Sequence, residues 1–167
     1  MKKIFFFLFF LSVFFSCTKP EKYSTTPKIS YIEIPVKDTL DQLGNSIKRC
    51  MLTYYLIDGD GDIGFEEGDT VSPYQIDGLY YNNLLITMYK LVDGIYYRVD
   101  TPEIGTPFYF RTKHIEPIGQ NKTLKCSIYV NLDFDYPSSW DSIKFDFFMY
   151  DRALHKSNVE TTPMIVL

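Results

Sequence analysis

Two long runs in which hydrophobic and polar residues alternate constrain the fold of this chain more than any other feature. In the first run, SIKRCMLTYYLI at 46–57, every second residue from Cys50 to Leu56 is hydrophobic. The second run, TLKCSIYVNLDF at 123–134, shows the same alternation from Leu124 to Leu132. Because successive side chains of a strand point to opposite faces, each run predicts a strand with one hydrophobic face. A second sheet is needed to cover those faces.

Shorter runs of the same kind, separated by turn residues, follow one another through the chain. The strongest turn signal is Asp93-Gly94, a dipeptide that favours a two-residue hairpin. No run repeats hydrophobic residues with the helical period of 3.6, so we expect little helix. We therefore predict an all-β domain of about seven strands, a two-sheet antiparallel sandwich of immunoglobulin or fibronectin-III type, with a closed barrel as the alternative. The further expected strands are 28–36, 84–92, 95–100, 107–115, 142–151 and 159–167.

The amino-terminal residues predict export and a lipid anchor. Lys2 and Lys3 precede an apolar run at 4–15, which is too short to span a bilayer comfortably and is typical of a signal-peptide helix. The run ends in FFSC, which resembles the lipobox of bacterial lipoproteins. This resemblance implies that residues 1–16 are a signal peptide and that Cys17 is lipidated; a plain secretory signal is the alternative. The polar segment 17–27 then forms a flexible tether to a domain at 28–167.

The charge of the chain argues against some partners. It has 17 Lys and Arg residues against 21 Asp and Glu residues, a net charge of −4. Loss of Lys2 and Lys3 with the signal peptide would leave 15 against 21, a net charge of −6. An acidic domain is a poor match for nucleic acid or for an anionic lipid surface. The predicted contact with the membrane is therefore the lipid on Cys17.

The segment DGDGDIGFEEGD at 58–69 is the strongest candidate for a metal site. Asp58, Asp60, Asp62 and Asp69 occupy positions 1, 3, 5 and 12 of a loop that is similar to an EF-hand. Calcium prefers six to eight oxygen ligands, largely from carboxylates on a tightly turning backbone. Glycines supply the positive-φ turns that bring such side chains together. These four aspartates are the predicted calcium ligands.

A second interpretation of this loop remains open, because it departs from the calcium pattern in two places. Ile63 stands at position 6, where such loops have glycine, and Asp69 stands where a glutamate usually closes the site. The loop could instead be a structural turn in which aspartates cap backbone N–H groups and Ile63 fills the core. Catalysis is disfavoured, because acidic residues this close together are too alike to divide acid and base roles.

The cysteines of the predicted domain leave two alternatives. Cys50 and Cys126 both lie on the hydrophobic faces of predicted strands, and an exported protein meets an oxidising environment. A disulfide between neighbouring strands is chemically allowed but geometrically strained. Two separate buried thiols are the alternative. His114 and His155 have no zinc-ligand spacing with these cysteines and are expected on the surface.

Three further segments carry a resemblance that spans nearly the whole predicted domain. The runs DGDGDIG at 58–64, GQNKTLK at 119–125 and YDRALHKSN at 150–158 resemble a group of Bacteroidota lipoproteins with an immunoglobulin-like domain. In the last run, Leu154 and His155 stand where related turns have Gly-Asn. The resemblance implies an outer-membrane location, on the periplasmic or the cell-surface side, and implies no activity.

No arrangement of residues in the sequence predicts an active site. We therefore expect a non-enzymatic binding or scaffold module that contacts an envelope protein or a glycan through strand edges or loops. Tyrosine-rich runs at 78–83, 94–99 and 107–112 should leave some aromatic rings exposed for such contacts. The alternative function is an accessory enzyme or glycan-binding protein of polysaccharide processing that uses the acidic loop.

Overall fold

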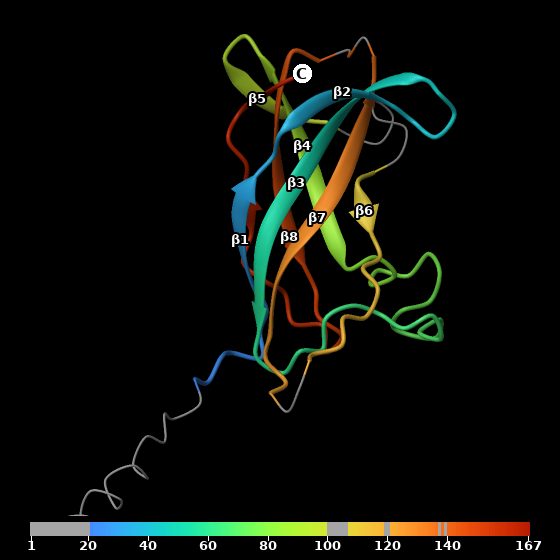
Figure 1. Cartoon of the computed structure of the whole chain (residues 1–167), viewed down its shortest axis with the longest axis vertical. Helices are drawn as coiled ribbons and strands as arrows, with labels where there is room; N and C mark the ends of the chain where they lie inside the picture. The colour runs from blue at the N-terminus through green and yellow to red at the C-terminus, as the bar shows by residue number, and fades with distance from the viewer. Residues whose placement is uncertain (1–20, 100–106, 119–120, 137, 139) are drawn as a thin grey trace, which may run out of the picture.

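The protein is a sandwich of two antiparallel β-sheets (Figure 1). The computed structural model describes residues 21–99, 107–118, 121–136, 138 and 140–167, and no helix occurs among them. The predicted all-β sandwich is therefore confirmed, and the closed-barrel alternative is wrong. No described residue belongs to a helix long and apolar enough to cross a membrane. The predicted signal peptide and Cys17 lie outside the described residues.

Strand β3 (Ser46–Asp58) is the central strand of the first sheet. Strand β7 (Leu124–Asp135) pairs with one side of β3 along almost its whole length. The other side of β3 is shared by β1 (Lys28–Glu33) and β2 (Val36–Leu40), each of which pairs with about half of it. Strand β2 was not predicted, because its side chains are mostly exposed or half-buried and show no hydrophobic face.

The second sheet is built on the pair β4 (Leu84–Val92) and β8 (Ser142–Met149). Four short strands flank this pair. Strand β4 also pairs with β5 (Ile95–Arg98) and β6 (Tyr109–Phe110). Strand β8 also pairs with β9 (Glu160–Thr161) and β10 (Ile165–Val166). The predicted hairpin between β4 and β5 is confirmed, with Asp93 at φ 50° and Gly94 at φ 80°. The predicted strand 159–167 is divided at Pro163, which has no N–H to donate to a neighbouring strand.

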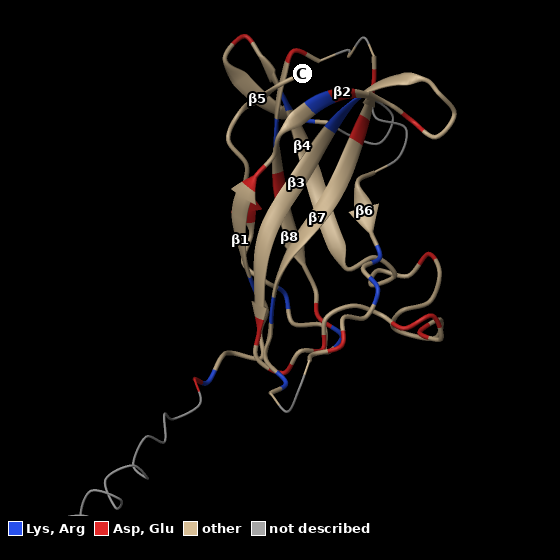
Figure 2. Cartoon of the chain, in the orientation of Figure 1, with Lys and Arg blue, Asp and Glu red and all other residues tan. Residues whose placement is uncertain are grey.

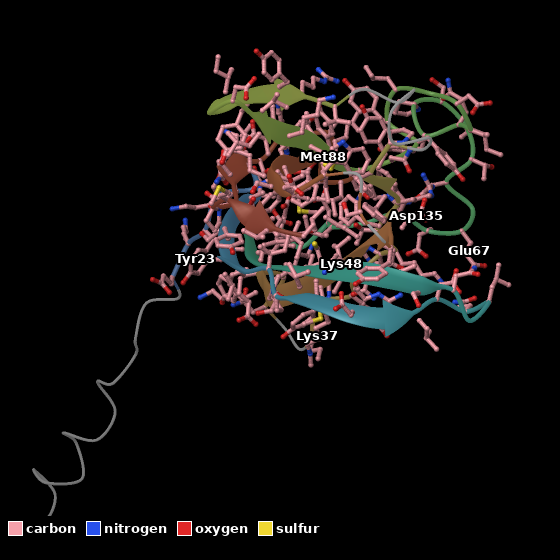
Figure 3. All side chains as sticks on the ribbon, turned by 90° about the horizontal axis from the view of Figure 1, so that it is seen from above. Tyr23, Lys37, Lys48, Glu67, Met88 and Asp135 are labelled. Carbon is pink, nitrogen blue, oxygen red and sulfur yellow. The ribbon has the colours of Figure 1, made fainter. Side chains whose placement is uncertain are left out.

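Side chains from the two sheets fill the space between them (Figure 3). The predicted inward residues of β3, from Cys50 through Leu52 and Tyr54 to Leu56, are all fully buried. The ring of Tyr54 lies 5.3 Å, centroid to centroid, from that of Phe147 on β8. Aromatic rings thus join the sheets at the centre of the core, where burial and ring geometry both contribute to stability.

The two cysteines of the domain are free thiols and do not form a disulfide. In the pairing of β3 with β7, Cys50 lies opposite Leu132, whereas Cys126 lies opposite Leu56. Six residues along a strand separate the two positions by about 20 Å, well beyond the reach of a disulfide. The alternative of two separate thiols is therefore correct. Burial raises the pKa of the Cys50 thiol to about 12, which keeps it protonated and unreactive.

The direction of the strands brings distant parts of the sequence to one end of the sandwich. Strands β3 and β8 belong to different sheets, yet both end at the lower end in Figure 1. The amino-terminal segment enters at the same end, where the Gly59 N–H donates a hydrogen bond of 2.8 Å to the Ser24 carbonyl. The residues that follow β3 and β8 are therefore neighbours.

Ile63 is a core residue although it lies in the acidic loop. Its side chain is fully buried, whereas that of Ile118 is 98% exposed. We expect Ile63→Ala to lower the free energy of unfolding by about 2–5 kcal/mol, because it leaves a cavity. The matched change Ile118→Ala should alter it by less than about 0.5 kcal/mol. Urea unfolding of both variants measures the difference, and equal effects would contradict the placement of Ile63.

Candidate functional site

Three carboxylates from two loops meet at the lower end of the sandwich. Asp58 is the last residue of β3, Asp62 follows it in the acidic loop, and Asp151 follows β8. One oxygen of each carboxylate lies within 4.8 Å of the corresponding oxygens of the other two. Figure 2 shows acidic residues on several loops at this end of the molecule. Asp58, Asp62 and Asp151 are called the carboxylate cluster below.

Glycines and Ile63 determine the path of the acidic loop. Gly61 (φ 69°) and Gly64 (φ 85°) adopt left-handed backbone conformations. A Cβ atom on either glycine would lie 2.1 Å from a backbone carbonyl oxygen, that of Lys122 or that of Lys113. Only glycine fits at these two positions. Ile63 lies between them and points into the core, which explains why position 6 is not glycine in this loop.

Backbone hydrogen bonds hold the carboxylates of Asp58 and Asp62 in place. The Asp62 N–H donates to Asp58 Oδ2 at 3.0 Å. Asp62 Oδ2 in turn accepts a hydrogen bond of 3.0 Å from the Ala153 N–H, and the Asp62 carbonyl accepts one from the Arg152 N–H at 3.0 Å. The aspartates therefore cap backbone groups, as the structural-turn interpretation predicts. They also join the loop after β3 to the loop after β8.

Each of these aspartates also leaves an oxygen without a partner. The Oδ1 atoms of Asp58, Asp60 and Asp62 are buried and form no hydrogen bond in the described part of the chain. A buried polar atom without a partner costs roughly 1–3 kcal/mol, and more when it is charged. Capping accounts for one oxygen of Asp58 and one of Asp62 and leaves the other oxygens unexplained.

The carboxylate cluster strongly disfavours its own negative charge. Burial, followed by the charges of Asp60 and Asp62, raises the pKa of Asp58 to about 7. Burial and the charge of Asp151 raise the pKa of Asp62. Burial also raises the pKa of Asp151, although its hydrogen bonds with His155 oppose the shift. Each of the three carboxyl groups therefore keeps its proton to a higher pH than a carboxyl group in water does.

Asp151 is the residue of this cluster that sequence reasoning missed. It is fully buried, and its Oδ1 accepts a hydrogen bond of 2.7 Å from the His155 N–H. His155 Nδ1 lies 2.8 Å from Asp151 Oδ2, and this contact raises the pKa of His155. From the sequence, YDRALHKSN carries a family resemblance and predicts a turn, with no indication of a ligand. Its link to the acidic loop depends on β3 and β8 ending at the same end, which the strand pattern does not specify.

Asp60 and Asp69 take other positions than the sequence pattern predicts. Asp60 is half-buried beside the cluster and acts on it through its charge. Asp69 forms an ion pair of 2.8 Å with Arg152 and accepts the Glu66 N–H at 2.8 Å. Its carboxylate is thereby occupied by a guanidinium and a backbone group. The structure brings Asp58 and Asp62 together with Asp151, in place of the fourth predicted ligand, Asp69.

A second candidate site is the outer edge of β7. This strand has twelve residues, and in the described part of the chain its backbone hydrogen-bonds only to β3. The other outer strands are short or interrupted: β2 has five residues, β5 has four, β6, β9 and β10 have two each, and β1 carries an irregularity between Tyr31 and Glu33. Short or bulged edges discourage pairing with other chains, whereas a long regular edge favours it.

The side chains of β7 match an edge that is open to a partner. Every outward residue of the strand is exposed, and Tyr129 at its middle is 63% exposed. Cys126 and Ile128 pack against the core but are only half-buried, and among the described strands only β3 pairs with β7. Lys125 lies near one end of the strand, and Asp133 and Asp135 lie near the other, so the edge carries charges of both signs.

Comparison with other proteins does not identify the chain. No protein-family profile, no curated protein and no solved structure matches it. The function is therefore inferred from the geometry of the carboxylate cluster and of the β7 edge.

The raised pKa of Asp58 predicts how stability depends on pH when divalent cations are chelated. The ordinary value is 3.8, and the folded value is about 7, so the folded state binds the proton more tightly than the unfolded state. The contribution of this group is complete below about pH 4 and is lost as the pH rises toward 7, at up to about 1.4 kcal/mol per pH unit. Chemical denaturation at pH 5 and pH 7 in EDTA measures this loss.

The control for this pH effect is Asp58→Asn, which has no proton to lose. The variant should lose distinctly less stability than the unmodified chain between pH 5 and pH 7 in EDTA. An identical loss in both proteins would show that Asp58 does not titrate as described.

Proposed function

We propose that this protein is a lipid-anchored module of the cell envelope that binds another envelope protein by strand addition at β7. The observation that carries the proposal is the length and regularity of the free β7 edge, beside outer strands that are short or interrupted. In strand addition, an extended segment of the partner forms main-chain hydrogen bonds with the edge, and side-chain contacts select the partner.

The chemistry of β7 suggests what such a segment would contact. Main-chain groups along the outer edge provide the affinity, as in other strand-addition complexes. Tyr129 offers an exposed ring at the centre of the edge for a cross-strand contact. The half-buried Cys126 and Ile128 would gain cover from an apolar residue of the partner. A partner segment with alternating apolar and polar residues fits this edge best.

A binding role agrees better than catalysis with the state of the acidic residues. Asp58 and Asp151 are fully buried, and a backbone N–H donates a hydrogen bond to one oxygen of each carboxylate. A general acid or base has to reach the proton that it transfers. Carboxylates enclosed in this way are suited to holding the loops together. The proposed lipid anchor rests on the lipobox-like FFSC before the domain, and the proposed outer-membrane location rests on the resemblance to Bacteroidota lipoproteins.

Photo-crosslinking at Tyr129 tests the strand-addition proposal. The full chain would carry a photoreactive phenylalanine at position 129, and irradiated membranes would be analysed by mass spectrometry. We expect an adduct with another envelope protein, linked through an extended segment. The matched control places the same group at Tyr97, which is 49% exposed on the four-residue strand β5. Equal adducts at both positions, or none at 129, would refute docking at β7.

Replacement of Cys17 tests the anchor. Cys17→Ser removes the sulfur that would carry the acyl chains, each methylene of which contributes about 0.8 kcal/mol when buried in a bilayer. We expect the variant to leave the membrane fraction, and we expect the mature unmodified protein to begin at a lipidated Cys17 by mass spectrometry. An unmodified Cys17, or cleavage at another position, would contradict the anchor.

A further inference from the structure

We propose that Asp58, Asp62 and Asp151 form a calcium site that joins the loop after β3 to the loop after β8. The site differs from the one predicted by the spacing of the aspartates, because Asp151 comes from the opposite sheet. The inference is independent of the proposed strand docking, which concerns the side of the first sheet and not the lower end of the sandwich.

The distances between the carboxylates suit a single cation. Calcium lies about 2.3–2.6 Å from its oxygen ligands, so two ligands of one ion are separated by no more than about 5 Å. The three carboxylate oxygens lie within 4.8 Å of one another, inside that limit. Their backbone partners already hold the side chains in this arrangement, so binding would require little reorganisation.

A second observation, separate from the clustering of acidic residues, also indicates a ligand. Asp58 is fully buried, and its Oδ1 has no hydrogen-bond partner among the described residues. Its Oδ2 accepts a hydrogen bond from the Asp62 N–H. Asp62 and the neighbouring Asp60 each have a buried Oδ1 in the same state. A bound cation would give these Oδ1 atoms the partner that they lack among the described residues.

The types of ligand favour calcium over other divalent cations. The three clustered side chains offer carboxylate oxygens, which suit hard cations such as calcium and magnesium, whereas zinc and copper prefer sites with histidine or cysteine. His155 Nδ1 is already engaged by Asp151. Magnesium requires near-ideal octahedral geometry and retains several waters, whereas calcium accepts irregular sets of six to eight oxygens. The three carboxylates come from two different loops and leave the remaining positions around the ion to other oxygens, which calcium tolerates better than magnesium does.

The chemistry of the site predicts opposite effects of one substitution in the presence and absence of calcium. Asp58→Asn keeps the shape of the side chain and an oxygen for the Asp62 N–H but removes the buried negative charge. In EDTA, the full-length variant should therefore melt at a higher temperature than the unmodified chain. With calcium, the unmodified chain should gain about 5–10 °C if the ion is present at roughly 100 times its dissociation constant, and the variant should gain almost nothing.

Two further variants identify the ligand set. Asp151→Asn should abolish the calcium-induced rise in melting temperature, because Asp151 supplies an oxygen from the second loop. Asp69→Asn should retain that rise, although it loses the ion pair with Arg152 and melts lower in both buffers. The exposed acid Glu67 in the same loop provides a surface control, and Glu67→Gln should behave as the unmodified chain.

The outcomes separate a cation site from a purely structural turn. No rise in the melting temperature of the unmodified chain with calcium would overturn the proposal, as would a rise that survives Asp151→Asn. A rise of equal size with magnesium alone would overturn the assignment to calcium. Because crosslinking at Tyr129 reads a different surface, failure of either proposal would leave the other standing.

Discussion

The convergence of buried carboxylates at the lower end of the sandwich is the interaction on which the rest of that end depends. Asp62 joins the loop after β3 to the loop after β8 by two hydrogen bonds, to Ala153 and to Arg152. The same convergence concentrates negative charge where little water can reach it, which raises the pKa values of all three carboxyls. A bound cation would stabilise the ionised form of these carboxylates, because its positive charge attracts all three and offsets their mutual repulsion.

This arrangement makes the two interpretations of the acidic loop compatible. Capping of backbone groups and burial of Ile63 are present, as a structural turn requires. The unpaired Oδ1 atoms are also present, and a structural turn alone does not explain them. In Asp58 and in Asp62, Oδ2 accepts a backbone hydrogen bond, and Oδ1 is available to an ion. Ile63, the residue that breaks the calcium-loop pattern, is required by the core.

The sequence allowed the sheets to be predicted better than the site. Alternation in 46–57 and 123–134 identified the inward residues of β3 and β7, because a buried face imposes a period of two on any strand. Asp58 and Asp62 were found because they are neighbours in the chain. Asp151 was missed, because its proximity to Asp58 depends on how two sheets stack and on which strands end together. Spacing alone also could not show that Arg152 would form an ion pair with Asp69, the fourth predicted ligand.

The two proposed sites, the carboxylate cluster and the β7 edge, lie in different parts of the molecule and have different roles. At the lower end, where the amino-terminal segment hydrogen-bonds to Gly59, Asp62 joins two loops, whereas no described strand pairs with the outer edge of β7. Stability and recognition would thus depend on different residues. An ion at Asp58 would also fix the start of β7, because Asp58 pairs with Leu124 in the register of the two strands.

Calorimetric titration of the full chain with calcium near pH 6.5, in two buffers that differ in ionisation enthalpy, tests the central claim most directly. One ion per chain should bind, with release of a substantial fraction of a proton, because Asp58 has a folded pKa of about 7 and has to ionise to hold the metal. The apparent enthalpy should therefore differ between the two buffers. Absence of binding heat in both buffers would contradict a site built on Asp58, and one-site binding whose enthalpy is the same in both would contradict the raised pKa of Asp58.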